Sequence, residues 1–221
     1  MSSATEHLDC LATDPHTKYR AYLLFGMPGS GKGTQGTVLG QLPNLIHISM
    51  GELLRKIPKH GRLGREIDQY TAQGLMVPDE LTGRIFRQHL HILELQELLV
   101  ADQHTLILDG LPRSYSQAEM FDSILDVVQI FHLKIQDTQL AMERLKARAL
   151  RENRLDDMSD EVIRRRLSTY YEDTYRTLSF YPPELVYEVD AGQSMIDVLR
   201  DIVNRLSEVK QASLAKAARQ A

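Results

Sequence analysis

Short apolar runs alternate with longer segments of mixed polarity along the chain. Each run is four to seven residues long, which suits a strand buried in a sheet. The runs cover residues 22–25, 45–48, 105–108, 127–133 and 185–189. Because the segments between them carry helical patterns, the alternation predicts an α/β fold with a five-stranded, parallel, doubly wound sheet. Ligands are expected at the carboxyl ends of its strands.

The segments between the apolar runs have the spacing and the end signals of helices. Ser49 and Glu52 have the spacing of a capping box, which predicts a helix that begins there. Gly74 is expected to end a further helix that begins near Leu63. The other helices are predicted over residues 34–42, 80–99, 117–125 and 194–209, over a segment that includes 140–148, and from about 161.

The two ends of the chain differ from the rest. Residues 1–20 are polar with few apolar anchors, and they are expected to form a loose N-terminal extension. Residues 209–221 are compatible with a helix but carry little apolar surface, and they are expected to be a C-terminal tail. The pattern between these ends predicts a single domain over residues 21–208.

A glycine-rich turn, GMPGSGKGT at residues 26–34, follows the first apolar run and precedes a predicted helix. Glycines let the backbone curl around an anion, and the N-terminus of the helix adds partial positive charge. Lys32 can reach the outer phosphates of a nucleotide. The order of strand, loop and helix therefore predicts a P-loop, with an ordinary glycine turn as the alternative. The residues expected to contact the nucleotide are Gly29, Ser30, Gly31, Lys32, Gly33 and Thr34.

Asp109 directly follows the apolar run 105–108, where an acid is unusual unless it is solvated or near a cation. In a P-loop fold the neighbouring strand end carries an acid that holds Mg²⁺, directly or through water, and this is the role expected of Asp109. The alternative is an aspartate that caps a turn. Gly33 stands where most P-loops have a Ser or Thr that ligates the metal. The metal is therefore expected to be held mainly by phosphate oxygens and water.

Four motifs resemble those of the nucleoside monophosphate kinases of the adenylate kinase family. They are GMPGSGKGT at 26–34, SMGELLR at 49–55, GLMVPDEL at 74–81 and LILDGLPR at 106–113, the last followed by Gln117. With an arginine-rich region, they cover the chain from about residue 21 to 206 in the family order. The resemblance implies a three-layer P-loop NTPase fold. It also implies a small monophosphate-binding segment at 49–78 and a short lid at 149–160 without a zinc-binding insert.

The resemblance also implies a role for each candidate residue. Arg55 and Arg113 would grip the phosphate of the acceptor monophosphate, and Gln117 would read its base. Arg144 would stack on the adenine of ATP. The cationic residues implied in catalysis are Lys32, Arg113, Arg148, Arg154 and Arg166, of which the last two also contact the substrates. The acceptor pocket would further include Met50, Met76, Val77 and Gly110, and the ATP site would include Gln193.

Three positions bear on the choice between alternative lid arginines and between alternative acceptor nucleotides. Arg165 competes with Arg166, which is preferred because Arg166-Leu167 precedes Tyr170-Tyr171 as in the R-L-x-x-Y-Y pattern of the family. Met50 stands where adenylate kinases usually have Thr near the acceptor base, whereas Gln117 stands where UMP/CMP kinases have Asn. The expected reaction is reversible phosphoryl transfer from MgATP to AMP. A UMP/CMP kinase and a non-catalytic nucleotide-binding module remain the alternatives.

Composition bears on the setting in which the protein acts. The 221 residues carry a formal net charge of −4, without the basic excess typical of nucleic-acid-binding proteins. Cys10 is the single cysteine, which excludes an intrachain disulfide and a cysteine zinc cluster. No apolar stretch could span a bilayer, and residues 1–20 lack the core of a signal peptide. We expect a soluble cytoplasmic monomer that binds ATP and AMP, but neither nucleic acid nor a membrane.

Overall fold

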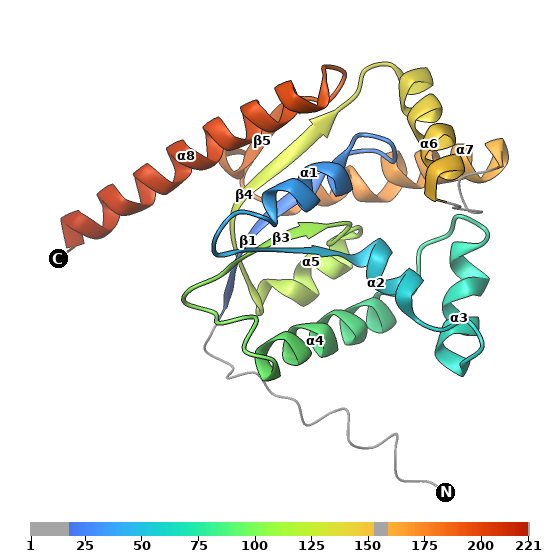
Figure 1. Cartoon of the computed structure of the whole chain (residues 1–221), viewed down its shortest axis with the longest axis horizontal. Coiled ribbons are helices and arrows are strands. Elements are labelled where there is room, and N and C mark those ends of the chain that lie inside the picture. Colours follow the sequence, from blue (N-terminus) through green and yellow to red (C-terminus); the bar gives the residue numbers. More distant parts are fainter. Residues whose placement is uncertain (1–17, 153–158, 221) are drawn as a thin grey trace, which may run out of the picture.

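The computed structural model describes residues 18–152 and 159–220. Within these ranges, five strands form one sheet in the order β2-β3-β1-β4-β5, and every neighbouring pair is parallel (Figure 1). The predicted parallel, doubly wound sheet is therefore confirmed. The strands are β1 (Tyr19–Phe25), β2 (Leu45–Ser49), β3 (Thr105–Asp109), β4 (Leu125–Lys134) and β5 (Val186–Asp190).

Helices connect the strands and flank the sheet (Figure 1). They are α1 (Lys32–Leu39), α2 (Met50–Lys56), α3 (Arg62–Thr71), α4 (Asp79–Leu95), α5 (Tyr115–Asp122), α6 (Thr138–Glu152), α7 (Asp160–Thr169) and α8 (Met195–Gln220). A π-helical turn (Tyr170–Thr174) and two 3₁₀ turns (Arg176–Phe180 and Pro183–Leu185) lie between α7 and β5. None of the described helices is both long and apolar enough to cross a membrane.

The strand β1 shows how the sheet divides the core into two layers, because successive side chains of a strand point to opposite faces. Leu23 and Phe25 are buried on one face, in a cluster that also includes side chains of α4 and α5. Tyr22 and Leu24 are buried on the other face, with side chains of α1, α6, α7 and α8. This arrangement leaves the carboxyl edge of the sheet for the loops that follow β1, β2 and β3.

The prediction of a loose extension over residues 1–20 is wrong for its last two residues, because β1 begins at Tyr19. Tyr19 is buried at 1% exposure, and its hydroxyl donates a hydrogen bond to the Glu94 carboxylate in α4. The residue stands between Lys18 and Arg20, so the local pattern looks polar. Its burial depends on α4, which is 75 residues away from it in the sequence at Glu94.

The predicted capping box at the start of α2 does not form. Ser49 is the N-cap residue, but its side chain makes no capping hydrogen bond. Its hydroxyl lies 3.3 Å from the Oδ2 atom of Asp109 and donates to it. Ser49 pairs with Asp109 across the β2–β3 ladder, which places a carboxylate within reach of the hydroxyl. An ionised acceptor binds a hydroxyl more strongly than a neutral group does, so the tertiary contact replaces the local one.

Four helices end at positions that differ from the prediction, the first being α1, which stops at Leu39 rather than 42. Helix α4 stops at Leu95 rather than 99, and Glu97 in the following turn has a φ of 57°. Helix α5 stops at Asp122, because Leu125 already belongs to β4 and is buried. Helix α8 continues through the predicted tail to Gln220 and extends away from the sheet (Figure 1).

Candidate active site

The predicted P-loop connects β1 to α1 at the carboxyl edge of the sheet. Gly26, Gly29 and Gly31 have φ values of 147°, 88° and 91°, which side-chain-bearing residues rarely adopt. A Cβ atom at Gly29 would lie 2.5 Å from the carbonyl oxygen of Ala141 in α6, so this glycine is also required for space. At Gly31, nothing lies within 4 Å of the corresponding position. The loop is therefore packed against α6 on one side and open on the other.

Lys32 is the first residue of α1 and folds back over the loop. Its Nζ atom donates to the carbonyl oxygens of Gly26 at 2.6 Å and Met27 at 3.0 Å. Next to it, Ser30 is buried, and its hydroxyl has no hydrogen-bond partner within the described part of the chain. Gly33 and Thr34 complete the first turn of the helix, where Thr34 is exposed. The loop thus presents an ammonium group and a helix N-terminus together, a combination that suits phosphate.

The charge around Lys32 comes from several other elements. Burial lowers the pKa of Lys32 to about 8, and the negative charge of Asp109 opposes this shift. The positive charges of Arg113, Arg148 and Arg166 add to it. These arginines come from the loop after β3, from α6 and from α7. Such a gathering of like charges is unfavourable unless an anion neutralises it.

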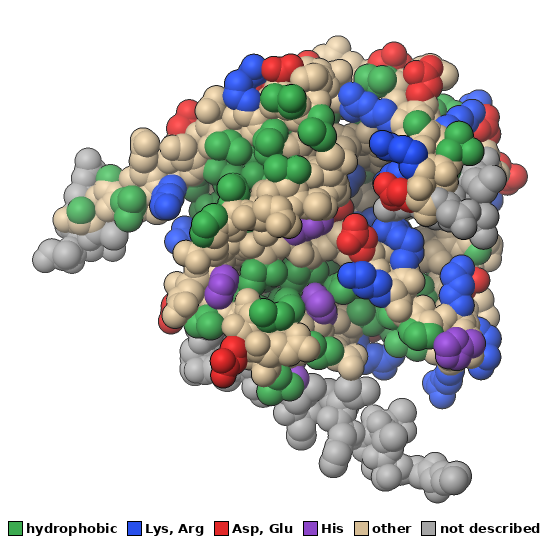
Figure 2. All heavy atoms as spheres, in the orientation of Figure 1, with side chains coloured by type: hydrophobic (Ala, Val, Ile, Leu, Met, Phe, Trp, Pro, Cys, Tyr) green, Lys and Arg blue, Asp and Glu red, His purple; other side chains and the backbone are tan. Residues whose placement is uncertain are grey.

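Positive charges also act on Arg113, which follows β3 on the side of the predicted acceptor site. Burial lowers the pKa of its guanidinium, and the charge of Arg166 lowers it further. Asp109 opposes the shift, and Arg55 adds to it. Figure 2 shows Lys and Arg side chains gathered around a hollow near α2, α3, α6 and α7. The structure therefore brings Lys32, Arg55, Arg113 and Arg166 into one electrostatic cluster.

A pocket beside this cluster is lined by α2, by the end of α3 and the segment that joins it to α4, by the start of α4, and by the loop after β3 with the start of α5. Its lining contains six residues that the sequence assigned to the acceptor: Met50, Met76, Val77, Gly110, Arg113 and Gln117. It also contains Leu75, which lies in the segment 74–77 whose backbone was expected to line the pocket. Gly51, Leu54, Thr71 and Thr82 were not predicted as site residues. Gly51 and Leu54 belong to the quoted motif at 49–55, so their motif membership could have identified them. Thr71 and Thr82 carry no such local signal.

Two glycines leave room for the guanidinium groups of Arg55 and Arg113, of which Arg113 lines the pocket and Arg55 does not. A Cβ atom at Gly51 would lie 3.2 Å from Nη1 of Arg55, and one at Gly110 would lie 2.9 Å from Nη2 of Arg113. Gly110 also has a φ of 79°. Both arginines therefore lie against backbone that carries no side chain. In each case the glycine and the arginine belong to the same motif.

Gln117 lies in the wall of the pocket, with 2% of its surface exposed. Its Oε1 atom accepts a hydrogen bond from the backbone N–H of Arg113 at 2.8 Å, and its Nε2 atom donates to Oδ1 of Asp79 at 2.7 Å. The Ser114 hydroxyl donates to the other carboxylate oxygen of Asp79 at 2.8 Å and accepts from the backbone N–H of Gln117 at 3.0 Å. Asp79 was not predicted as a site residue.

Asp109 ends β3 and lies between the P-loop and the acceptor pocket. A Cβ atom at Gly33 would lie 3.4 Å from its Oδ2 atom, so the carboxylate faces the start of α1. Within residues 18–152 and 159–220, no group of three or more His, Cys, Asp or Glu residues could hold a metal ion. Magnesium in nucleotide enzymes commonly uses one or two carboxylates, with phosphate and water supplying the remaining ligands. The single carboxylate beside a phosphate-type loop fits that chemistry.

Helix α6 carries two of the predicted arginines. Arg144 donates through Nη1 to the carbonyl oxygen of Ala191 at 2.7 Å and through Nη2 to that of Gln193 at 3.4 Å. Gln193 in turn donates to Asp201 at 2.6 Å. Arg144 of α6 and Gln193 of the loop after β5 thus lie next to each other. Both were predicted to contact the same ligand. Arg148 follows one helical turn after Arg144, towards Lys32.

The two competing arginines, Arg165 and Arg166, lie on α7 but make different contacts. Arg165 donates to the carbonyl oxygen of Gln73 at 3.1 Å and lies 3.6 Å from the Glu161 carboxylate. Arg166 is half-buried, and its charge acts on both Lys32 and Arg113. The electrostatic influence of Arg166 on both site cations favours it over Arg165 as the site residue. Arg154 lies outside the described residues.

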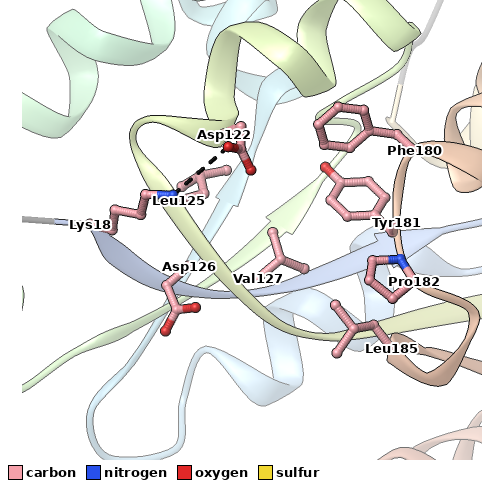
Figure 3. A pocket seen from close by; sticks show the side chains of 9 residues that line it. All are labelled: Lys18, Asp122, Leu125, Asp126, Val127, Phe180, Tyr181, Pro182 and Leu185. Atoms are coloured by element: carbon pink, nitrogen blue, oxygen red, sulfur yellow. Dashed lines mark ion pairs between the residues drawn. The ribbon is translucent and has the colours of Figure 1, made fainter.

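A second hollow, of about 320 Å³, lies at the opposite edge of the sheet, near the first residues of β1, β4 and β5 (Figure 3). Apolar side chains line it, among them Val127 and Tyr181, and a 3.9 Å ion pair between Lys18 and Asp122 lies at its side. None of the predicted site residues lines this hollow. Its size does not make it the candidate site, because the charged groups and glycine turns lie at the carboxyl edge.

Comparison with known protein families gives an independent result. The sequence model of the family described as "Adenylate kinase" matches residues 24–185, which is more than half of the chain. The chain belongs to the adenylate kinase family. The resemblance of its motifs to that family is therefore confirmed, and the five-stranded parallel sheet agrees with the P-loop NTPase fold of adenylate kinases.

Curated adenylate kinases match almost along their whole length. The chain is 34% identical over 195 residues to the adenylate kinase of Cyanothece sp., covering 85% of this chain and 95% of that protein. It is 34% identical over 196 residues to that of Prochlorococcus marinus, covering 85% and 100%. It is 32% identical over 198 residues to that of Micrococcus luteus, covering 86% and 92%. The similarity thus extends over the P-loop, the acceptor pocket and the arginine-rich region alike.

Proposed function

We propose that the chain is an adenylate kinase, which transfers a phosphoryl group reversibly from MgATP to AMP and so forms two ADP. The observation that carries the proposal is that the positive charge of Arg113 acts on Lys32 and lowers the pKa of its ammonium group. Lys32 belongs to the P-loop and Arg113 lines a separate pocket, so phosphate-binding groups of two different subsites lie within electrostatic reach of each other. Two nucleotides bound in these subsites would have their phosphates next to each other. Family membership supports the same reaction.

The P-loop side would hold ATP. Backbone N–H groups of Gly29, Ser30, Gly31, Gly33 and Thr34 and the ammonium group of Lys32 would bind its phosphates. Arg144 would stack on the adenine, since it is fixed by the loop that carries Gln193. Lys32 would exchange its carbonyl partners for phosphate oxygens, which also relieves the unfavourable burial of its charge.

The pocket side would hold AMP. Arg55 and Arg113 present two guanidinium groups, which suit a dianionic phosphate because each can bind it through two parallel hydrogen bonds. Gln117 would read the base, and Met50, Met76, Val77 and Gly110 would line it. Met50 takes the place of a hydroxyl-bearing residue, so base recognition would depend more on Gln117.

Asp109 would hold Mg²⁺ through its carboxylate or through bound water, with phosphate oxygens as the other ligands. When bound, the ion would neutralise the charge that develops on the phosphates. The orientation of Asp109 towards the start of α1 and the hydrogen bond from Ser49 support this assignment.

No side chain has to abstract a proton in this reaction. The acceptor is a phosphate oxygen, whose second pKa is about 6, so it is already ionised at neutral pH. The protein would act by positioning the two phosphates in line and by stabilising negative charge with Lys32, Arg113, Arg148, Arg154 and Arg166. Filling of the site by both nucleotides would exclude free water as the acceptor.

The organisation of the chain around this site follows the family pattern. Residues 49–78 would form the acceptor-binding segment within a kinase domain at 21–208, and residues 149–160 would form a short lid without zinc. Half of that lid, residues 153–158, lies outside the described part of the chain. Tyr19 and Arg20, which belong to β1, would join this domain, and residues 1–18 and 209–221 would lie outside the catalytic unit. The enzyme would act as a monomer in the cytoplasm.

The direct test is an acceptor panel with purified protein. Phosphoryl transfer from MgATP to AMP, UMP, CMP and GMP is measured by ADP release in a coupled assay. The proposal predicts that AMP has the highest kcat/KM. A preference for UMP or CMP would identify a pyrimidine monophosphate kinase instead. Binding of ATP without turnover of any acceptor would identify a non-catalytic module.

A further inference from the structure

The amide of Gln117 is held on two sides by groups of opposite hydrogen-bonding character. The backbone N–H of Arg113 can only donate, and it meets Oε1 at 2.8 Å. The carboxylate of Asp79 accepts, and it meets Nε2 at 2.7 Å. An amide turned by 180° would place two donors against each other on one side and two acceptors on the other. These partners therefore allow one orientation of the Gln117 amide.

Asp79 is itself fixed in place. Its second carboxylate oxygen accepts from the Ser114 hydroxyl at 2.8 Å, and Ser114 caps α5 through the backbone N–H of Gln117. Asp79 is the first residue of α4, whereas Ser114 and Gln117 belong to the start of α5. The carboxylate thus joins the ends of two helices and is not among the residues that line the acceptor pocket. It can act on a ligand only through Gln117.

The fixed amide has one hydrogen-bonding position left on each of its polar atoms. Nε2 keeps one N–H, and Oε1 keeps one lone pair. An adjacent donor and acceptor of this kind match adenine, which offers an amino donor beside a ring-nitrogen acceptor. Guanine carries an oxo acceptor at the position of the adenine amino group, so it would meet Oε1 with a second acceptor. A free amide could rotate to suit guanine, but an anchored one cannot.

We propose that Asp79 is a positioning residue that fixes the Gln117 amide and thereby makes the acceptor site select 6-aminopurine over 6-oxopurine monophosphates. This inference rests on the proposed AMP kinase activity. It assigns no contact between Asp79 and either nucleotide. Loss of Asp79 should therefore change the choice of base more than it changes the transfer step.

The test compares kcat/KM for AMP and for GMP in Asp79→Ala and in the wild type. Removal of the acceptor oxygen should lower the AMP-to-GMP ratio roughly tenfold, in the range of one bidentate base contact. The change should appear mainly in the KM for AMP, while kcat and the KM for ATP stay close to wild type. Asp79→Asn keeps an oxygen that can accept from Gln117, so it should restore most of the selectivity. Asp79→Ser, which can still support the start of α4 but is too short to reach the amide, repeats the test if the alanine variant does not fold.

Two controls separate positioning from a general effect. Glu80→Ala removes a charge from the same first turn of α4 at an exposed residue, and it should leave the ratio unchanged. In a Gln117→Ala background, Asp79→Ala should have no further effect on the ratio, because the group it acts through is gone. Additive effects of the two substitutions would contradict the proposal.

The outcomes distinguish this inference from the proposed function. A wild-type enzyme that uses AMP, together with a folded Asp79→Ala or Asp79→Ser variant of unchanged AMP-to-GMP ratio, overturns the role of Asp79 alone. An equal loss of kcat/KM for both acceptors also overturns it, because that result indicates a structural defect. A wild-type protein that does not phosphorylate AMP overturns the proposed function itself, whatever the variants do.

Discussion

The Nζ atom of Lys32 lies 2.6 Å from the carbonyl oxygen of Gly26, so the lysine of the P-loop is bound by the first glycine of the same loop. The contact holds an ammonium group in a site where burial lowers its pKa and three arginines repel it. Backbone carbonyls alone compensate a buried charge poorly. A bound phosphate would compensate it better, and this is the physical reason to expect strong nucleotide binding here.

Replacement of Lys32 by methionine keeps most of the length of the side chain and removes its charge. We expect kcat for ADP formation to fall about 10²–10³-fold, the usual cost of one electrostatic group directed at the transition state. The thermal unfolding midpoint should not fall by more than a few degrees, because the substitution also removes a costly buried charge. Wild-type turnover by Lys32→Met would exclude the lysine from catalysis.

Arg165 and Arg166 form a matched pair on α7. Arg166→Ala should lower kcat by about 10³-fold, since an arginine at the transferring phosphoryl group contributes that much in related reactions. Arg165→Ala removes an exposed ion pair and one contact to Gln73, and it should change kcat by no more than about threefold. Steady-state kinetics of both variants decide the assignment. The reverse order of effects would show that Arg165 is the catalytic arginine.

Gly29 and Gly31 allow a test of the loop that does not depend on activity. Both have positive φ, which costs a residue with a Cβ about 1–2 kcal/mol. Alanine at position 29 would also push its Cβ to 2.5 Å from the Ala141 carbonyl oxygen, whereas position 31 has open space. Denaturant unfolding of the ligand-free protein should therefore show a loss of about 3 kcal/mol or more for Gly29→Ala and about 1–2 kcal/mol for Gly31→Ala. Equal losses would mean that the loop does not pack against α6 in this way.

His132 predicts a pH dependence of stability. It is buried in β4 at 3% exposure, and its Nε2 atom lies 2.9 Å from the Tyr170 hydroxyl. Burial lowers the pKa of His132 to about 4; the nearby Glu188 carboxylate opposes the shift, and Lys134 and Lys32 add to it. Because the unfolded chain binds this proton near pH 6.5, the free energy of unfolding should fall as the pH drops from 6.5 to 4, by up to about 3 kcal/mol from this residue.

The control for this dependence is His132→Gln, which can still bond Tyr170 but does not titrate. Its free energy of unfolding should fall less steeply than that of the wild type over the same pH range. The pKa values of His47 and His89 are also lowered by burial, so some slope should remain in the variant. Parallel curves for the two proteins would show that His132 is not held neutral by the fold.

The sequence was sufficient to predict the features that depend on residues close together in the chain. The P-loop and Asp109 could be predicted because a glycine turn and an acid each directly follow an apolar run. Family membership followed from motifs that are contiguous in the chain. The same reasoning failed at Ser49, whose hydroxyl binds Asp109 instead of its own helix, because the competing acceptor lies 60 residues away.

Contacts between distant segments explain what the sequence did not reveal. The start of β1 at Tyr19 depends on Glu94, and the Gln117 amide depends on Asp79, which is 38 residues away. Propensity and periodicity contain no information on such pairings, which form only when the sheet brings the segments together. The end of α4 was missed for a local reason instead, because Glu97 in the following turn has a positive φ, a conformation that its residue type does not suggest.

The central claim is tested most directly by incubation of the purified protein with MgADP as the only nucleotide. Two subsites that accept ATP and AMP together must also bind two ADP molecules and exchange a phosphoryl group between them. The products are measured by chromatography over time. The account predicts that ATP and AMP appear in equal amounts until equilibrium is reached. ADP that remains unchanged under conditions in which the protein is folded would contradict it.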